Sequence, residues 1–142
     1  MAQARSETRT SISAVGVSVH ILDSPLPSPG PPRDVPNAGA VLCFEGVVRP
    51  MEAGRRIVAL DYEVYEPMAT TLLRRLGEEV ARHHGLIDLS VEHSRGRVRA
   101  GECSFRLRVA SPHRPEALRA VEEFVDRMKR DVPIWKTAVY EE

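Results

Sequence analysis

Hydrophobic and polar residues alternate along three segments of the chain, which predicts strands at residues 15–22 and 57–65 and a hairpin or meander at 87–110. In the second of these segments, one face carries Val58, Leu60, Tyr62 and Val64. A fourth segment, residues 40–48, is apolar on both faces, which is typical of an interior strand. The pattern therefore predicts half-buried strands together with one fully buried strand.

Two other segments have the spacing of amphipathic helices. The first follows Pro67 and ends before Gly85, and its apolar residues recur every four positions: Met68, Leu72, Leu76 and Val80. The second begins near Arg114 and has an apolar stripe made of Leu118, Val121, Phe124, Val125 and Met128. Pro133 holds the residue before it extended, so we expect a short final strand after this helix.

This order of strands and helices predicts an α+β fold with both helices on one face of a mainly antiparallel sheet. No GxGxxG or P-loop sequence follows a strand, which argues against the common nucleotide-binding folds. We expect a frayed N-terminus at residues 1–14 and a single domain at 15–142. Six of the 11 prolines fall within residues 23–38, and this predicts an extended loop, because proline lacks the N–H that a strand ladder needs.

The charge of the chain is balanced, with 20 Lys and Arg against 20 Asp and Glu, which argues against a nucleic-acid partner. No apolar stretch approaches the roughly 20 residues that span a bilayer, so we expect no membrane partner. Cys43 and Cys103 lie in apolar runs without a zinc or disulfide pattern, and we expect two buried, reduced thiols in a cytoplasmic protein. His83 and His84 have no third ligand at metal spacing, so no metal site is predicted.

All but two of the 20 basic residues are arginine, and the two lysines are Lys129 and Lys136. Each lysine is a candidate for a site that needs an amine, because a lysine beside apolar surface can lose its proton whereas arginine stays charged. Pro133 lies between them and could return Lys136 to the same cleft as Lys129. The alternative is that Lys129 merely covers apolar surface and complements the end of its helix.

A second candidate site is the start of the last helix, in the sequence SPHRPEA at residues 111–117. His113 and Arg114 lie at the first turn, where free N–H groups and the positive end of the helix dipole favour an anion such as phosphate. The alternative is an ordinary turn in which Arg114 pairs with Glu116 or another surface carboxylate, since surface ion pairs are common and weak.

Five segments, taken in this order and spacing, resemble the catalytic (large) subunit family of molybdopterin synthase: GAVLCFEGVVR at 39–49, LDYEVYEPMA at 60–69, EHSRGRVRAGE at 92–102, ASPHRPEA at 110–117 and MKRDVPIWK at 128–136. The resemblance implies an α/β hammerhead-type α+β fold. It also implies a homodimer within a heterotetramer, in which each copy binds a small ubiquitin-like sulfur-carrier subunit.

The activity implied by the resemblance is sulfur transfer in molybdenum cofactor biosynthesis. The carrier's C-terminal Gly-Gly thiocarboxylate would enter the site, and two sulfurs would pass to cyclic pyranopterin monophosphate to form the molybdopterin dithiolene, with no cofactor or metal required. Lys129 and Lys136 match the family's two active-site lysines. Arg49, His113 and Arg114 match its anion-binding and substrate-positioning residues.

The chain departs from the family pattern in two respects. Thr137 and Ala138 stand where the family has a basic residue and a glutamate, and the sequence stops at Glu142 without the family's longer C-terminal tail. These departures motivate an alternative: a dimeric, catalytically impaired module that binds the sulfur carrier or an anionic metabolite. A third, less specific alternative is a ferredoxin-like dimer with a regulatory ligand.

Overall fold

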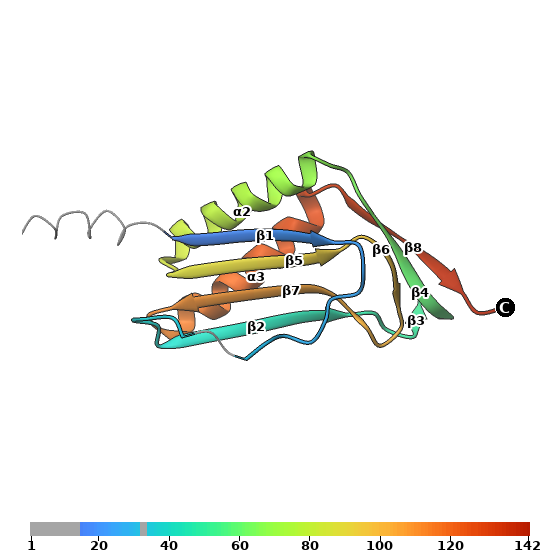
Figure 1. Ribbon diagram of the computed structural model, residues 1–142, viewed down its shortest axis with the longest axis horizontal. Coiled ribbons are helices and arrows are strands. Elements are labelled where there is room, and N and C mark those ends of the chain that lie inside the picture. Colours follow the sequence, from blue (N-terminus) through green and yellow to red (C-terminus); the bar gives the residue numbers. More distant parts are fainter. Residues whose placement is uncertain (1–14, 32–33) are drawn as a thin grey trace, which may run out of the picture.

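Two helices cover one face of a four-stranded sheet, and a second, smaller sheet continues from one end of the first (Figure 1). The computed structural model describes residues 15–31 and 34–142. The first sheet has the strand order β1 (Gly16–Leu22), β5 (Asp88–Ser94), β7 (Cys103–Ser111) and β2 (Ala40–Val47). In the second sheet, β4 (Arg55–Val64) pairs with β3 (Met51–Glu52), β6 (Gly96–Arg99) and β8 (Ile134–Tyr140). The frayed segment predicted at residues 1–14 lies outside the described residues, and the predicted domain limits stay a prediction.

Strand pairing is antiparallel throughout both sheets except between β1 and β5, which are parallel. The predicted α+β class is therefore confirmed. The meander predicted at residues 87–110 differs in detail, because β5 pairs directly with β7 while β6, between them in sequence, pairs with β4 in the second sheet. Gly96, the first residue of β6, and Gly101, just after it, have φ angles of 94° and 92°, a left-handed conformation that favours glycine and lets the chain change sheets.

The helices α2 (Met68–His84) and α3 (Arg114–Asp131) enclose the main core against the first sheet. Its largest fully buried side chains come from both helices and from the two central strands: Phe124, Leu73, Val80, Leu89 and Leu107. A separate small cluster holds the second sheet together and consists of Val48, Ile57, Leu60 and Val98. Both clusters are stabilised chiefly by apolar burial, worth about 25 cal/mol per Å².

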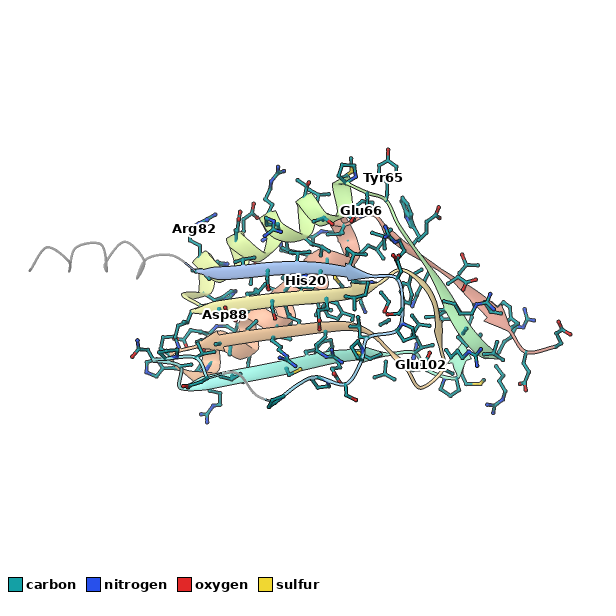
Figure 2. The ribbon with its side chains drawn as sticks, viewed as in Figure 1. His20, Tyr65, Glu66, Arg82, Asp88 and Glu102 are labelled. Atoms are coloured by element: carbon teal, nitrogen blue, oxygen red, sulfur yellow. The ribbon has the colours of Figure 1, made fainter. Side chains whose placement is uncertain are left out.

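The first helix begins and ends where the sequence predicts, but its buried face is displaced by one residue at the start. Glu66 accepts a hydrogen bond of 2.9 Å from the backbone N–H of Thr70, which satisfies one of the free donors of the first turn (Figure 2). Gly85 ends the helix in a left-handed conformation. Met68 is 49% exposed, and the neighbouring Ala69 is buried instead.

The strand predicted to be interior, β2, is an edge strand that pairs with β7. Val41, Phe44 and Val47 along it are 55%, 40% and 52% exposed. A run of apolar residues predicts burial but does not say whether the covering surface belongs to the same chain. An apolar edge strand of this kind is suited to contact another chain.

A second correction concerns the face of β4. Val58 is 44% exposed, whereas Ile57 and Ala59 on either side of it are 2% and 1% exposed. The pairing with β8 shifts register between Ile57 and Ala59, so the simple alternation predicted for this strand is interrupted there.

The described part of the proline-rich segment has neither helix nor strand and runs back beside the first sheet, from the end of β1 to the start of β2 (Figure 1). Leu26 anchors it: its side chain is buried, and its N–H donates to the carbonyl of Cys103 over 2.9 Å. The expectation of two buried thiols is wrong for Cys43, which is exposed, while Cys103 is half-buried; both are free.

Arg106 ties the same segment to the sheet. Its guanidinium is 3% exposed and donates to Glu45 over 2.7 Å, to Glu92 over 3.0 Å and to the carbonyl of Pro27 over 2.6 Å. Two carboxylates and a carbonyl thus compensate the cost of burying one charge.

Candidate functional site

A cavity of about 640 Å³ lies between the two sheets and the C-terminal end of α3. Its lining comes from β2 and the loop after it, from β3 and β4, from β5 and β7, from the C-terminal part of α3 and from the start of β8. Three of the five predicted site residues line it: Arg49, Lys129 and Lys136. The cavity therefore brings Arg49 together with the two lysines, which lie about 80 residues further along the sequence.

Glu52 links two of these cations. Its carboxylate lies 3.6 Å from the Nζ of Lys136 and 3.9 Å from an Nη of Arg49. It is presented by the tight β3–β4 hairpin, in which Ala53 and Gly54 have φ angles of 51° and 79°, as a type I′ turn requires. Lys136 is half exposed and Arg49 is 79% exposed, so both ion pairs are open to solvent and to an incoming anion.

Lys129 is in the last turn of α3, at the rim of the cavity beside Val125 and Met128. Its side chain is exposed, and among the described residues it has no carboxylate within ion-pairing distance. The helix ends two residues later, at Asp131, and the N–H of the C-cap residue Val132 donates to the carbonyl of Met128 over 3.1 Å. Lys129 therefore presents to the cavity an amine that no acidic side chain of residues 15–31 and 34–142 pairs with.

The inner wall of the cavity carries polar groups that the sequence analysis did not select. The hydroxyls of Tyr62 and Ser104 lie 3.0 Å apart. His93 is 4% exposed, and its ring meets the ring of Tyr62 edge to face at 5.1 Å between centroids. Its Nδ1 lies 2.8 Å from the carbonyl oxygen of Ser94. A carbonyl only accepts, so Nδ1 carries the proton and Nε2 is left as an acceptor when the ring is neutral.

Burial lowers the pKa of His93, and the hydrogen bond to the Ser94 carbonyl opposes this only in part. The ring is therefore neutral at physiological pH. The signal that could have identified it is a histidine at an apolar position of an alternating strand, a pattern that more often marks a satisfied core residue. A neutral imidazole beside two hydroxyls provides hydrogen-bonding groups without adding charge.

His113 and Arg114 lie at the opposite end of α3 and do not line this cavity. From Arg114 to Lys129 the helix rises about 1.5 Å per residue, which separates the two groups by roughly 22 Å along its axis. His113 is the N-cap residue, and its Nδ1 lies 3.9 Å from a carboxylate oxygen of Glu116. Within one chain, the predicted site is thus divided into a group of three residues and a group of two.

The cavity combines two amines, one guanidinium and one carboxylate with a wall of hydroxyls and a neutral imidazole. This set is suited to binding an anion and to exchanging protons with it. In the described ranges, the side chains grouped closely enough to hold a metal ion lie between α2 and α3, outside the cavity. No helix within residues 15–31 and 34–142 has the length and apolar character needed to cross a membrane.

The sequence model of the MoaE protein family matches residues 32–131 of this chain. The molybdopterin synthase catalytic subunit of Bacillus subtilis is 39% identical over 105 residues, which are 74% of this chain and 67% of that protein. The human catalytic subunit is 36% identical over 107 residues, which are 75% of this chain and 57% of that protein. The chain thus spans a little over half the length of the human relative.

Solved structures agree with these relatives. The crystal structure of molybdopterin synthase from Staphylococcus aureus is similar with a TM-score of 0.75 and 32% identity, covering 86% of this chain and 90% of that chain. A structure described as a complex of subunits 1 and 2 of molybdopterin-converting factor from Helicobacter pylori is similar with a TM-score of 0.67 and 25% identity, covering 87% and 90%. The resemblance found in the sequence is therefore confirmed, and the chain belongs to the MoaE family of molybdopterin synthase catalytic subunits.

Proposed function

We propose that this chain transfers sulfur from the C-terminal thiocarboxylate of a small ubiquitin-like carrier subunit to cyclic pyranopterin monophosphate, forming the molybdopterin dithiolene. The observation that carries the proposal is the convergence of Arg49, Lys129 and Lys136 on one cavity. The family's active-site lysines match the two lysines of this chain, and both are in that cavity. Its relatives are named for the same enzyme.

The charges of the cavity suit both reactants. A thiocarboxylate tail and a cyclic phosphate are anions that repel each other, and a cleft that holds them together must supply positive charge. Arg49 can offer a planar pair of N–H donors to phosphate oxygens, and Lys136 can offer a compact ammonium. Binding would displace Glu52, whose ion pairs with both cations are exposed.

Proton transfer is the role we assign to Lys129. Opening the cyclic phosphate and expelling water both require proton transfer at the reacting atoms, and a positioned amine can serve where a guanidinium cannot. Lys129 has no carboxylate partner among the described residues and lies at the cavity rim, where it can meet both the carrier tail and the pterin.

An exposed apolar rim supports docking of the carrier beside the cavity. Phe44, Val47 and Trp135 line the cavity and are 40%, 52% and 54% exposed. Trp135 is thus not a core residue, since the described part of the chain leaves about half of it exposed, and aromatic side chains are enriched at protein interfaces. We place the enzyme in the cytoplasm, where the free thiols Cys43 and Cys103 would stay reduced.

His113 and Arg114 would act from a second copy of the chain. They lie too far along α3 to reach the cavity of their own protomer, and the family resemblance implies a homodimer. Val41, an exposed residue of the edge strand β2 that does not line this cavity, marks a candidate region for the contact between copies. In a dimer with two-fold symmetry every contact between the copies occurs twice, so the dimer would contain two equivalent sites, each completed by both chains.

Complementation between inactive variants tests this arrangement. Lys129→Arg and Arg114→Ala are each expected to reduce conversion strongly when present in both copies. If the site is shared, a mixed dimer contains one intact site, and unfolding and reassembling the two variants together restores conversion. If His113 and Arg114 act within their own chain, the mixture stays as inactive as the separate variants.

The conversion itself is tested with purified protein, thiocarboxylated carrier and cyclic pyranopterin monophosphate, with molybdopterin as the measured product. The proposal predicts product formation that depends on the thiocarboxylate. The alternative binding module, which Thr137 and Ala138 motivate, predicts saturable carrier binding without product. Ala138 packs against the small cluster of the second sheet, and its methyl group cannot supply the negative charge of the glutamate that the family has at this position.

A further inference from the structure

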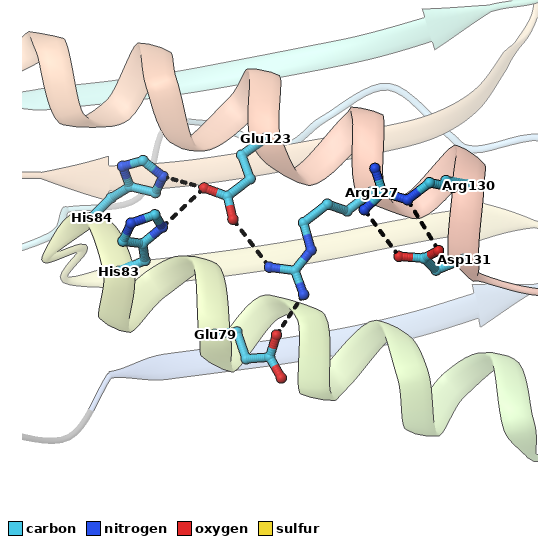
Figure 3. A network of polar contacts seen from close by, with 7 residues as sticks. All are labelled: Glu79, His83, His84, Glu123, Arg127, Arg130 and Asp131. Atoms are coloured by element: carbon cyan, nitrogen blue, oxygen red, sulfur yellow. Dashed lines mark hydrogen bonds and ion pairs between the residues drawn. The ribbon is translucent and has the colours of Figure 1, made fainter.

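Two histidines and a glutamate converge between the helices, outside the cavity described above. His83 and His84 occupy the last turn of α2, and both rings point at Glu123 of α3 (Figure 3). His83 Nδ1 lies 3.1 Å, and His84 Nε2 2.7 Å, from the same carboxylate oxygen, Oε1. The three potential ligand atoms all lie within 4.8 Å of one another.

These separations are close to those of a metal site. Zinc binds histidine nitrogen and carboxylate oxygen at about 2.0–2.2 Å, which places the ligand atoms of a tetrahedral site about 3.4 Å apart. The Nδ1 of His83 lies 3.1 Å from Glu123 Oε1 and must move slightly away from it to leave room for the ion. The ring of His83 is 69% exposed, so it is free to turn outward in this way. The ring of His84 is 11% exposed and is held in place by the surrounding helices.

Glu123 is held in position by its neighbours. Arg127 donates to its other oxygen, Oε2, over 3.0 Å and also donates to Glu79 of α2 (Figure 3). The result is a carboxylate with one oxygen fixed by arginine and the other turned towards two imidazoles, an arrangement typical of supported metal ligands.

The electrostatic setting also favours a cation. Glu79 and Glu123 contribute two negative charges against one positive charge on Arg127. The C-terminal end of α2 adds the partial negative charge of the helix dipole at the histidines. The sequence gives no sign of this, because the third ligand belongs to another helix and is 39 positions after His84.

We propose that His83, His84 and Glu123 bind one divalent transition-metal ion of the zinc class, which joins the end of α2 to α3. Two imidazoles and one carboxylate select Zn²⁺, Ni²⁺ or Cu²⁺ over Mg²⁺ and Ca²⁺, which take mainly oxygen ligands. The exposed side of His83 leaves the fourth position to water. The ion binds the folded arrangement of two helices, so its effect is to stabilise the helical layer, and it takes no part in sulfur transfer.

The test is zinc titration of the full chain, purified without a histidine tag and stripped of metal. Calorimetry is expected to give one Zn²⁺ per chain, and Co²⁺ is expected to give the visible absorption of a tetrahedral site. His83→Gln, His84→Gln and Glu123→Gln are each expected to weaken Zn²⁺ binding at least tenfold. Zinc is expected to raise the Tm of the wild type and to leave the Tm of these variants unchanged.

The matched control is His20→Gln, which removes an exposed histidine of β1 that is not part of the cluster (Figure 2). It should bind Zn²⁺ like the wild type. His83→Gln is the decisive variant, because His83 is largely exposed and its loss should leave the circular dichroism spectrum unchanged. The proposal is overturned if the wild type shows no saturable Zn²⁺ binding, if folded His83→Gln binds like the wild type, or if His20→Gln weakens binding as much as His83→Gln does.

Discussion

Glu52 holds two of the cations that we assign to substrate binding, and replacing it with glutamine should tighten the binding of the phosphate substrate. The carboxylate lies 3.6 Å from Lys136 and 3.9 Å from Arg49, whose side chains are 51% and 79% exposed. Exposed pairs of this kind contribute about 0.2–1 kcal/mol each, so the two together hold the cations by roughly 0.4–2 kcal/mol. An incoming phosphate must displace Glu52 from both cations. The cost of breaking these two ion pairs corresponds to about a 2- to 30-fold increase in the dissociation constant of the phosphate.

The assay is the KM for cyclic pyranopterin monophosphate in the conversion reaction, at saturating carrier and at two ionic strengths. Glu52→Gln is expected to lower KM by about 2- to 30-fold at low salt, with a smaller effect at high salt, where exposed charges are screened. Glu141→Gln is the control, because Glu141 forms a similar exposed pair, 3.6 Å from Arg56, outside the cavity. A KM that rises in Glu52→Gln, or that falls equally in Glu141→Gln, would refute the reasoning.

Two further predictions concern stability. Burial lowers the pKa of His93 in the folded chain below the usual 6.5, so below pH 6.5 the unfolded chain binds more protons than the folded chain, and the free energy of unfolding falls as the pH falls. Urea unfolding at about pH 7 and pH 5.5 should therefore show a smaller decrease in this free energy for His93→Gln than for the wild type. Equal decreases in the two proteins would contradict this account. Arg106→Met should lower the free energy of unfolding by about 3 kcal/mol, because it leaves Glu45 and Glu92 without their buried partner. Arg108→Met, on the same strand, is the comparison. Equal decreases in the free energy of unfolding of the two variants, measured by chemical denaturation, would contradict a stabilising role of the ion pairs.

Much of the fold follows from local patterns. The boundaries of α3 are predicted well, because Pro115 suits the first turn and Val132 precedes a proline, which ends the helix. The cavity residues Lys129 and Lys136 stand out because the chain otherwise uses arginine. Their presence in one cavity depends on the short turn at Pro133, which the sequence also indicates.

What the sequence does not predict depends on contacts between distant segments. The apolar run of β2 is exposed at a sheet edge, since no segment within residues 15–31 and 34–142 covers it. The interruption at Val58 arises from pairing with β8, which local alternation does not reveal. His93 becomes part of the cavity wall, and Glu123 meets His84, only because strands and helices far apart in sequence pack together.

The central claim, that the amine of Lys129 takes part in sulfur transfer, is tested most directly by the single-turnover rate of product formation in Lys129→Arg. Arginine keeps the charge and removes the exchangeable amine, so the rate should fall by about 10²- to 10⁴-fold while carrier binding stays unchanged. Arg130→Lys, the reverse substitution at the adjacent exposed residue, should retain the wild-type rate. A Lys129→Arg variant that converts substrate at the wild-type rate would contradict the account.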